Sequence, residues 1–332
     1  MRSDSKVPLP AEQVAALTRT LIGAEPEAVT ELTEGMYNAA YRVTVPGRGD
    51  LVLKVAPPDD VPSLRYERSL MATEVGFYER AQGLAPVPDV VATDFSRRLV
   101  DRDVMFMSAL DGRSLHSARR RLSRGARRAV RADLGAIVGR LHGVTGERFG
   151  YERTGGELSA ATWREAFGTM TAAVLDDIRE HGVPIGVDPG EVRMILHAAS
   201  GALAAVETPV LVHFDLWDGN VFVARQGGVE RVSGIIDGER AFWGDPLADL
   251  VSTSLFRDPA ADRDFLRGYA EASGTPLRFD DAARTRLALY SAYLCLLMLA
   301  EAAPRGYRGL GAAGMAMFVR RRLKADLRRL SA

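Results

Sequence analysis

Three oxygen-bearing side chains flank a predicted β-hairpin in the second half of the chain. Asp215 and Asn220 precede the hairpin in the stretch HFDLWDGN, and Asp237 follows it in the stretch IIDGE. Apolar runs on either side of Gly227-Gly228 predict the hairpin over residues 221–236. Because a hairpin brings its two ends together, we expect the three side chains to converge.

Two carboxylates and a carboxamide are suited to phosphoryl transfer. Asn220 and Asp237 offer the oxygen ligands that Mg²⁺ prefers, while the carboxylate of Asp215 can accept a proton from a substrate hydroxyl. The order His213-x-Asp215-x4-Asn220, with an aspartate beyond a hairpin, matches the catalytic loops of kinases. Asp215 and Asn220 could each be ordinary turn residues, but their joint occurrence at this spacing favours catalysis. We assign His213 to hydrogen bonds that support the loop.

The stretches HFDLWDGN, IIDGE and GDPLADL resemble the aminoglycoside phosphotransferase family, within the small-molecule kinases that share the protein-kinase fold. The similarity spans residues 32–250 and is weaker in the helical tail. It implies an α+β, bilobal protein-kinase-like fold. The expected parts are a small β-rich N-terminal nucleotide-binding lobe (residues 1–107), a hinge (108–112) and a large helical C-terminal lobe with the catalytic loop and substrate site (113–332).

Lys54 lies in the apolar strand predicted over residues 51–55. A strand lysine can simply point to solvent. The resemblance instead implies that Lys54 reaches the α- and β-phosphates of ATP and is held by a glutamate from the next helix. We favour Glu74, which lies about three turns before the helix exit, where the family places its glutamate, with Glu67 as the alternative. The predicted helix, residues 64–82, carries three glutamates: Glu67, Glu74 and Glu79.

The loop between the first two predicted strands contains Gly35 and Asn38. A loop of small residues between strands can bring backbone N–H groups close to phosphate oxygens, although a plain hairpin turn explains it equally well. The resemblance favours a reduced phosphate-covering loop. It also implies that the backbone of Ser108 and Leu110, in the hinge, hydrogen-bonds the adenine.

Two further acidic pairs surround the predicted catalytic stretch. Asp245 and Asp249 in GDPLADL are expected to cap the following helix and brace the catalytic loop. Asp218 and Glu239 could make a negative patch for a polycationic aminosugar. Equally, they could merely balance Arg240.

Composition is that of an ordinary globular protein, with 47% hydrophobic and 26% charged residues. Lys+Arg equals Asp+Glu, so no global field attracts nucleic acid or membranes. The single cysteine, Cys295, lies in an apolar helical run, which favours packing and a reducing compartment. With no apolar segment at the N-terminus, a cytoplasmic protein is expected.

One region is strongly basic: Arg119, Arg120, Arg121, Arg124, Arg127, Arg128 and Arg131. A nucleic-acid patch is conceivable, but no aromatic residues are interleaved, and a solvated helix face explains the pattern. His142, which follows, is expected to be a capping or core residue.

Apolar patterning predicts the remaining elements. Strands are expected near residues 28–33, 41–45, 89–93, 98–100 and 104–107. Helices are expected near residues 10–22, 117–144, 159–181, 188–206, 246–256, 259–273, 279–302 and 313–330.

The sequence therefore predicts an ATP- and Mg²⁺-dependent kinase that acts on a hydroxyl of a small molecule. The resemblance implies an aminoglycoside or related antibiotic as substrate, with choline, homoserine or fructosamine as alternatives. Phe214 and Gly238 stand where the family often has a small residue and an aromatic one, which puts substrate-side packing in doubt. A nucleotide-binding module without catalysis is a further alternative. A metal hydrolase built on His213 and Asp215 lacks additional histidine ligands at suitable spacing.

Overall fold

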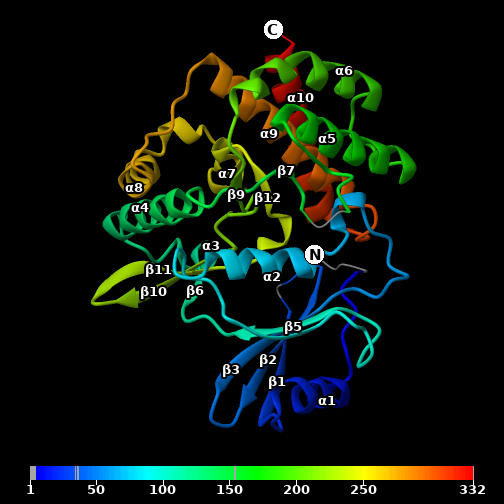
Figure 1. Cartoon of the computed structure of the whole chain (residues 1–332), viewed down its shortest axis with the longest axis vertical. Coiled ribbons are helices and arrows are strands. Elements are labelled where there is room, and N and C mark those ends of the chain that lie inside the picture. The colour runs from blue at the N-terminus through cyan, green and yellow to red at the C-terminus, as the bar shows by residue number, and fades with distance from the viewer. Residues whose placement is uncertain (1–4, 34, 36, 153–154, 332) are drawn as a thin grey trace.

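The computed structural model describes residues 5–331 apart from 34, 36, 153 and 154, and it has two lobes (Figure 1). The N-terminal lobe contains a five-stranded antiparallel sheet in the order β1-β2-β3-β5-β4. Its strands are β1 (Ala28–Leu32), β2 (Ala39–Val45), β3 (Gly49–Val55), β4 (Val90–Asp94) and β5 (Val104–Ser108).

Side chains of this sheet alternate between two apolar layers, because successive strand residues point to opposite faces. Leu53 and Phe106 belong to a small core shared with α1 (Ala11–Ile22). Met105 faces the other way, into the large core that includes α2 (Leu70–Ala81) and continues through the helical lobe. The sheet thus joins α2 to the second lobe on the face where the nucleotide residues are expected.

The C-terminal lobe is mainly helical. Its helices are α3 (Leu115–Ala118), α4 (Arg124–Leu141), α5 (Trp163–Glu180), α6 (Pro189–Ala199), α7 (Asp249–Thr253), α8 (Arg263–Ser273), α9 (Asp281–Ala300) and α10 (Leu310–Leu330). Short 3₁₀ turns lie at η1 (Arg65–Glu67), η2 (Ser200–Ala205), η3 (Gly238–Arg240), η4 (Pro246–Ala248) and η5 (Pro259–Ala261).

Two small sheets hold the predicted catalytic stretch against these helices. One has the order β11-β10-β6, and the other has the order β8-β7-β12-β9. The strands are β6 (Arg113–Ser114), β7 (Phe149–Gly150), β8 (Ser159–Ala160), β9 (Val210–Val212), β10 (Val221–Gln226), β11 (Val229–Ile235) and β12 (Phe242–Gly244). The loop from β9 to β10 and the segment from β11 to β12 are therefore neighbours.

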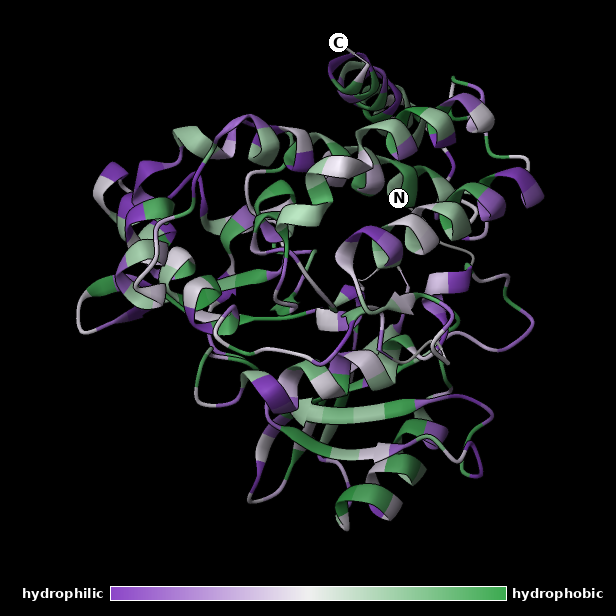
Figure 2. Cartoon of the chain, turned by 45° about the horizontal axis from the view of Figure 1, so that its top comes forward, coloured by the Kyte–Doolittle hydropathy of each residue, from purple (hydrophilic) through white to green (hydrophobic). Residues whose placement is uncertain are grey.

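The central helix of the lobe is α9, which is buried along most of its length and mostly green in the hydropathy view (Figure 2). At the left edge of the lobe in Figure 1, α4 and α8 approach closely through glycines. A Cβ on Gly135 would lie 2.0 Å from the carbonyl oxygen of Phe265, and one on Gly268 would lie 2.0 Å from that of Ala132. No helix in the described part of the chain has the length and apolarity needed to cross a bilayer.

The α+β bilobal fold is confirmed, and so is the hairpin, with Gly227 and Gly228 at positive φ in its turn. The lobe and hinge boundaries at 107 and 112 stay a prediction, although β5 ends at Ser108 and β6 begins at Arg113.

Several element predictions were wrong in detail. The helix expected from residue 64 begins at Leu70, because extended Arg68 ends the 3₁₀ turn and Ser69, at the N-cap of α2, is left-handed with φ 61°. The expected strand at 98–100 is replaced by bends. The helix expected over 117–144 is divided into α3 and α4, and Ser123 caps α4 by accepting a hydrogen bond from the N–H of Ala126.

Candidate active site

The hairpin brings Asn220 and Asp237 to the same end. At its base Val221 pairs with Ile235, and beyond that pair the N–H of Ile236 donates to the carbonyl oxygen of Asn220 at 3.0 Å. The Asn220 side chain turns back and donates its Nδ2 to the carbonyl oxygen of Asp215 at 2.9 Å. Asp215, Asn220 and Asp237 are thus gathered at one place.

His213 and Asp249 fix the loop that carries Asp215. The carboxylate of Asp249 accepts hydrogen bonds from the backbone N–H groups of His213 (3.1 Å) and Phe214 (2.7 Å) and contacts His142 Nε2 at 3.0 Å. The N–H of Asp215 donates to His213 Nδ1 (3.2 Å). His213 Nε2 therefore carries the proton and donates to the carbonyl oxygen of Ile236 (3.0 Å). Burial lowers the pKa of His213, in agreement with this neutral form.

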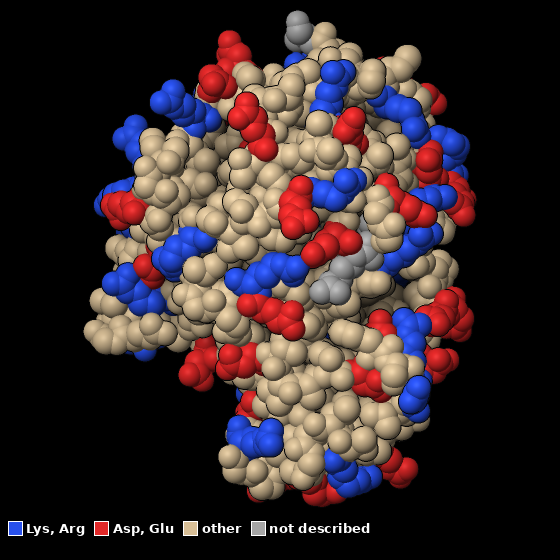
Figure 3. Space-filling model, in the orientation of Figure 1, with Lys and Arg blue, Asp and Glu red and all other residues tan. Residues whose placement is uncertain are grey.

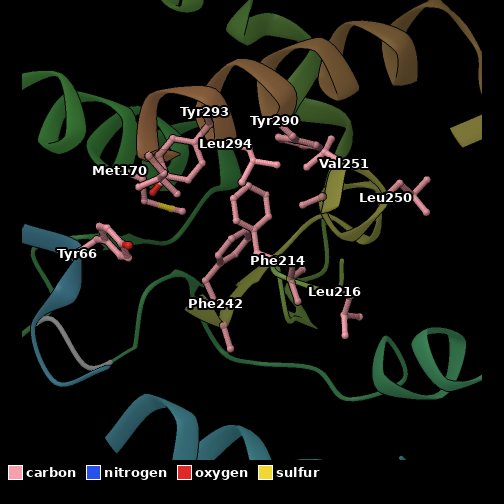
Figure 4. Close-up of a cluster of buried hydrophobic side chains, with 14 of the residues drawn as sticks. Tyr66, Met170, Phe214, Leu216, Phe242, Leu250, Val251, Tyr290, Tyr293 and Leu294 are labelled. Atoms are coloured by element: carbon pink, nitrogen blue, oxygen red, sulfur yellow. The ribbon is translucent and has the colours of Figure 1, made fainter. Parts of the chain in front are cut away.

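Aromatic side chains of the helical lobe pack against the same loop. Phe214 is fully buried, has φ 63°, and its ring centroid lies 5.1 Å from that of Phe242 and 5.7 Å from that of Tyr293 (Figure 4). A Cβ on Gly238 would lie 2.4 Å from Phe77 Cδ1. The two departures from the family pattern are thus explained by packing, since Phe214 fills the core and Phe77 occupies the space over Gly238.

Lys54 joins the two lobes. Strand alternation puts it on the face of β3 opposite Leu53, toward α2, where its Nζ lies 2.9 and 2.7 Å from the Glu74 carboxylate oxygens and 2.7 Å from Asp237 Oδ1. Glu74 is completely buried and also accepts a hydrogen bond from Tyr78 at 2.6 Å. Burial alone would lower the pKa of Lys54, but Asp237 and Glu74 raise it overall, so the ammonium stays charged.

A chain of buried ion pairs holds Asp215. Arg240 Nη1 lies 3.2 Å from Asp215 Oδ1, and its Nη2 lies 2.7 Å from Glu301 Oε1. Arg305 continues the chain, with Nη1 2.9 Å from Glu301 and Nη2 2.7 Å from Glu67. This series of ion pairs therefore connects the turn before α2, through the end of α9, to Asp215.

The electrostatics of Asp215 are unusual for an aspartate. Burial raises its pKa to about 7; Arg240 opposes the rise, and Asp237 and Glu301 add to it. The side chains of Asp215 and Asp237 remain 21% and 39% exposed, so a ligand can reach both carboxylates.

Comparisons with known proteins identify the family. The model of the phosphotransferase enzyme family (APH) matches residues 28–290, most of the chain. The chain belongs to this family. It is therefore a phosphotransferase that acts on small molecules, as the sequence resemblance implied. A comparison with curated proteins found no match.

Solved structures share the fold of this phosphotransferase. A putative fructosamine-3-kinase from Thermobifida fusca is 24% identical with a TM-score of 0.64, and 96% of this chain and 100% of that one are covered. The aminoglycoside phosphotransferase APH(4)-Ia is 20% identical with a TM-score of 0.65, covering 97% and 100%. A thermostable mutant of that enzyme, solved with AMP-PNP and hygromycin B, is 20% identical with a TM-score of 0.64, covering 96% and 98%.

The donor set of the phosphotransferase fits Mg²⁺. Asn220 uses its Nδ2 for Asp215, which leaves Oδ1 as a free acceptor, and Asp237 uses only Oδ1 for Lys54. Among the described residues, no three His, Cys, Asp or Glu side chains form a metal cluster. Two protein oxygens completed by phosphates and water are the usual arrangement for this ion.

The phosphate-covering loop contacts the second lobe. Asn38 is buried and donates its Nδ2 to Glu239 Oε2 at 3.1 Å, and the Arg305 guanidinium lies 4.7 Å from the Tyr37 ring centroid. Gly35 is exposed in the same loop. Burial raises the pKa of Glu239 to about 8, with Lys54 opposing this and Asp237 adding to it.

Two predicted residues lie differently from expectation. Asp218 is turned toward Arg119 (3.4 Å). Asp245 does not brace the catalytic loop; it caps η4 and accepts hydrogen bonds from Arg286 (2.8 Å) and Tyr290 (2.7 Å), and the bracing carboxylate is that of Asp249.

At the hinge, the N–H of Ser108 already donates to the carbonyl oxygen of Asp89 at 2.9 Å. Any bond from Ser108 to adenine therefore falls to its carbonyl oxygen. Leu110 packs its side chain against Gly234, where a Cβ would lie 2.3 Å from Leu110 Cδ1. The backbone role of both residues stays a prediction.

The sequence analysis missed Glu301 and Arg305 and gave Arg240 only a balancing role. No local motif marks Glu301 or Arg305, which lie just after an apolar helix. The available signal for Arg240 was its place three residues after Asp237, on a turn that must pass close to Asp215.

Proposed function

We propose that this phosphotransferase transfers the γ-phosphate of ATP, with Mg²⁺, to a hydroxyl of a small molecule. The observation that carries the proposal is the shared position of Asp215, Asn220 and Asp237 beside Lys54. Positioning and charge neutralisation are most of what phosphoryl transfer requires of a protein.

Each side chain has a part in this proposal. Lys54, held by Glu74, neutralises the nucleotide phosphates. Asn220 and Asp237 would hold Mg²⁺, which when bound would shield the charge of the phosphates. Asp215 accepts the proton of the acceptor hydroxyl. Its pKa of about 7 makes it a stronger base than an ordinary aspartate while leaving it substantially ionised near neutral pH.

Nucleotide binding requires one exchange of partners. The three ammonium protons of Lys54 point at three carboxylate oxygens, two on Glu74 and one on Asp237. A phosphate oxygen must replace one of these. Asp237 is the more exposed partner, so we propose that it gives way to phosphate and becomes free to bind the ion.

For the acceptor we propose an aminoglycoside or related antibiotic, with a metabolite kinase of the fructosamine, choline or homoserine type as the second candidate. The structural neighbours support both candidates, since one binds hygromycin B and another is a putative fructosamine kinase. The unpaired thiol of Cys295 suits a cytoplasmic reaction.

An ADP-release screen tests the proposal. The purified protein is given ATP and Mg²⁺ with aminoglycosides, other hydroxylated antibiotics, fructosamines, choline and homoserine, and products are identified by mass spectrometry. Acceptor-dependent ADP release that is lost in Asp215→Asn is expected. Turnover of choline or homoserine with no response to any antibiotic would reject the antibiotic assignment alone. No ADP release above background by the native protein with any acceptor would reject catalysis and leave a nucleotide-binding module, whereas equal acceptor-dependent release by both proteins would reject Asp215 as the base.

A further inference from the structure

A cavity of about 350 Å³ lies in the helical lobe, on the side of the catalytic loop that carries Asp218. This volume is in the range of small-molecule sites. Its walls come from α3, the start of α4 and the segment between α7 and α8. The charged side chains that line it are Arg119, Arg127, Arg131, Arg257, Asp218, Asp258 and Asp262.

Four guanidinium groups thus face three carboxylates. Arg131 is paired with Asp262 at 2.7 Å, and Arg119 with Asp218 at 3.4 Å. The carboxylate of Asp258 caps η5 by accepting a hydrogen bond from the N–H of Ala260 at 3.0 Å.

Two of the arginines have no carboxylate of their own. Arg127 donates its Nε to the carbonyl oxygen of Leu122 at 3.1 Å. No carboxylate of the described residues lies within 4.0 Å of Arg127 or Arg257 in an ion pair. The cavity therefore has a surplus of positive charge and unused N–H donors.

The frame around these donors is rigid. The glycine contacts described above lock α4 against α8, and the Arg131 guanidinium also lies 5.2 Å from the Phe265 ring centroid. Buried Leu115, Thr253 and Ser254, together with Ala261, complete the lining. A fixed frame reduces the entropy lost when a ligand is held.

We propose that this cavity binds a small molecule carrying phosphate or carboxylate groups. Arg127 and Arg257 supply charge-assisted, forked hydrogen bonds to such groups, and the paired Arg119 and Arg131 shape the walls. The face of the molecule shown in Figure 3 has no such bias, since basic and acidic side chains are interspersed on it. None of the described residues that line the cavity is aromatic, so these residues offer no stacking platform of the kind that single-stranded nucleic acid uses.

The site is close to the reacting groups. Asp218 is three residues from Asp215 in one loop, and three residues span at most about 11 Å. The occupant is either an anionic part of the acceptor or a separate anionic ligand. In both cases Asp218, neutralised by Arg119, does not act as a receptor for a polycationic sugar.

Calorimetric titration with inorganic phosphate and with citrate, in the absence of nucleotide and at low ionic strength, tests the site. The full chain is compared with the double variant Arg127→Ala/Arg257→Ala. The matched control is Arg120→Ala/Arg124→Ala, which removes the same charge from exposed arginines outside the cavity lining. We expect saturable binding by the native chain and the control, weakened by added salt, and binding weaker by roughly tenfold or more in the cavity variant.

Three results would overturn the site. They are no saturable binding of either anion, equal affinity in the two double variants, and binding of an oligonucleotide with no binding of the small anions. Thermal unfolding of each variant checks that the fold is kept. Because no nucleotide is present, the result does not depend on the proposed transfer reaction.

Kinetics with an acceptor found by the ADP-release screen distinguish the two sources of the anion. A raised KM for the acceptor in Arg127→Ala/Arg257→Ala, with kcat unchanged, identifies an anionic part of the acceptor. An unchanged KM, together with lost phosphate or citrate binding, identifies a separate ligand.

Discussion

Two cations lie between carboxylates where the lobes meet, and their surroundings differ. Lys54 lies between Glu74 and Asp237, and Asp237 is 39% exposed. Arg240 lies between Asp215 and Glu301. Glu301 is also paired with Arg305, and Arg305 in turn with Glu67. Lys54 can exchange the exposed carboxylate of Asp237 for a phosphate. Arg240 has no such exposed partner except Asp215, because Glu301 is buried. We infer that the Lys54 cluster is a ligand site and the Arg240 cluster is a support for the base.

Removal of the base should have the largest effect. In Asp215→Asn the proton acceptor is lost while the shape is kept, so kcat should fall by about 10²–10⁴. Steady-state ADP release measures kcat, and an unchanged affinity for nucleotide would show that the Lys54 cluster is intact. Asp176→Asn, on an exposed part of α5, is the control for a general loss of charge. A kcat within a factor of a few of the native value would reject Asp215 as the base.

Removal of the charge on Lys54 should have the second largest effect. Lys54→Met removes the charge that faces the phosphates, so kcat/KM for ATP should fall by about 10²–10³, with weaker nucleotide binding. Titration with AMP-PNP measures the affinity. If nucleotide affinity and turnover both survived, the distinction between the two clusters would be lost.

The two clusters also differ in how far they could be predicted. Asp215, Asn220, Asp237 and Lys54 lie in short stretches whose local pattern predicts a hairpin and a strand, so their meeting follows from hairpin closure and strand alternation. The pairing of Glu74 with Lys54 could be predicted once the helix that carries Glu74 was placed against the strand that carries Lys54. Glu301 reaches Arg240 on η3, and Arg305 reaches Glu67 on η1, because α9 and the segment after it end beside these two turns. Such tertiary proximity has no local signal.

The anion cavity was beyond prediction for the same reason. The basic run from Arg119 to Arg131 was interpreted as a solvated helix face, but it breaks between α3 and α4, and this break directs three of its arginines to a common space with Arg257. For Asp245 and Asp249, position could be predicted but role could not. Their helix-start positions were predictable, but which one braces the loop depends on how η4 is oriented.

The pH dependence of turnover should report on the supporting cluster. Asp215 acts as the ionised form, and burial raises its pKa to about 7, so kcat/KM should fall about tenfold per unit as the pH decreases below this value. Glu301 adds to the rise, so Glu301→Gln should move this acid limb to lower pH. The variant should also lose up to about 3–5 kcal/mol of unfolding free energy, because it breaks a buried ion chain.

A pH–rate profile and urea unfolding measure the two effects of Glu301→Gln. Glu271→Gln, an exposed position on α8, is the control for both. A loss of stability with an unmoved acid limb would mean that Glu301 supports the fold without acting on Asp215.

The smallest effect is expected where the phosphate-covering loop contacts the second lobe. Asn38→Ala removes a side-chain hydrogen bond from this loop to Glu239. One such bond contributes about 0.5–1.5 kcal/mol, so the KM for ATP should rise by up to roughly tenfold, with kcat little changed. Asn38→Ser can keep a donor at this position and should restore part of the affinity. An unchanged KM in both variants would show that the loop closes over the nucleotide without this contact, and that the ligand-side cluster is organised by Lys54, Glu74 and Asp237 alone.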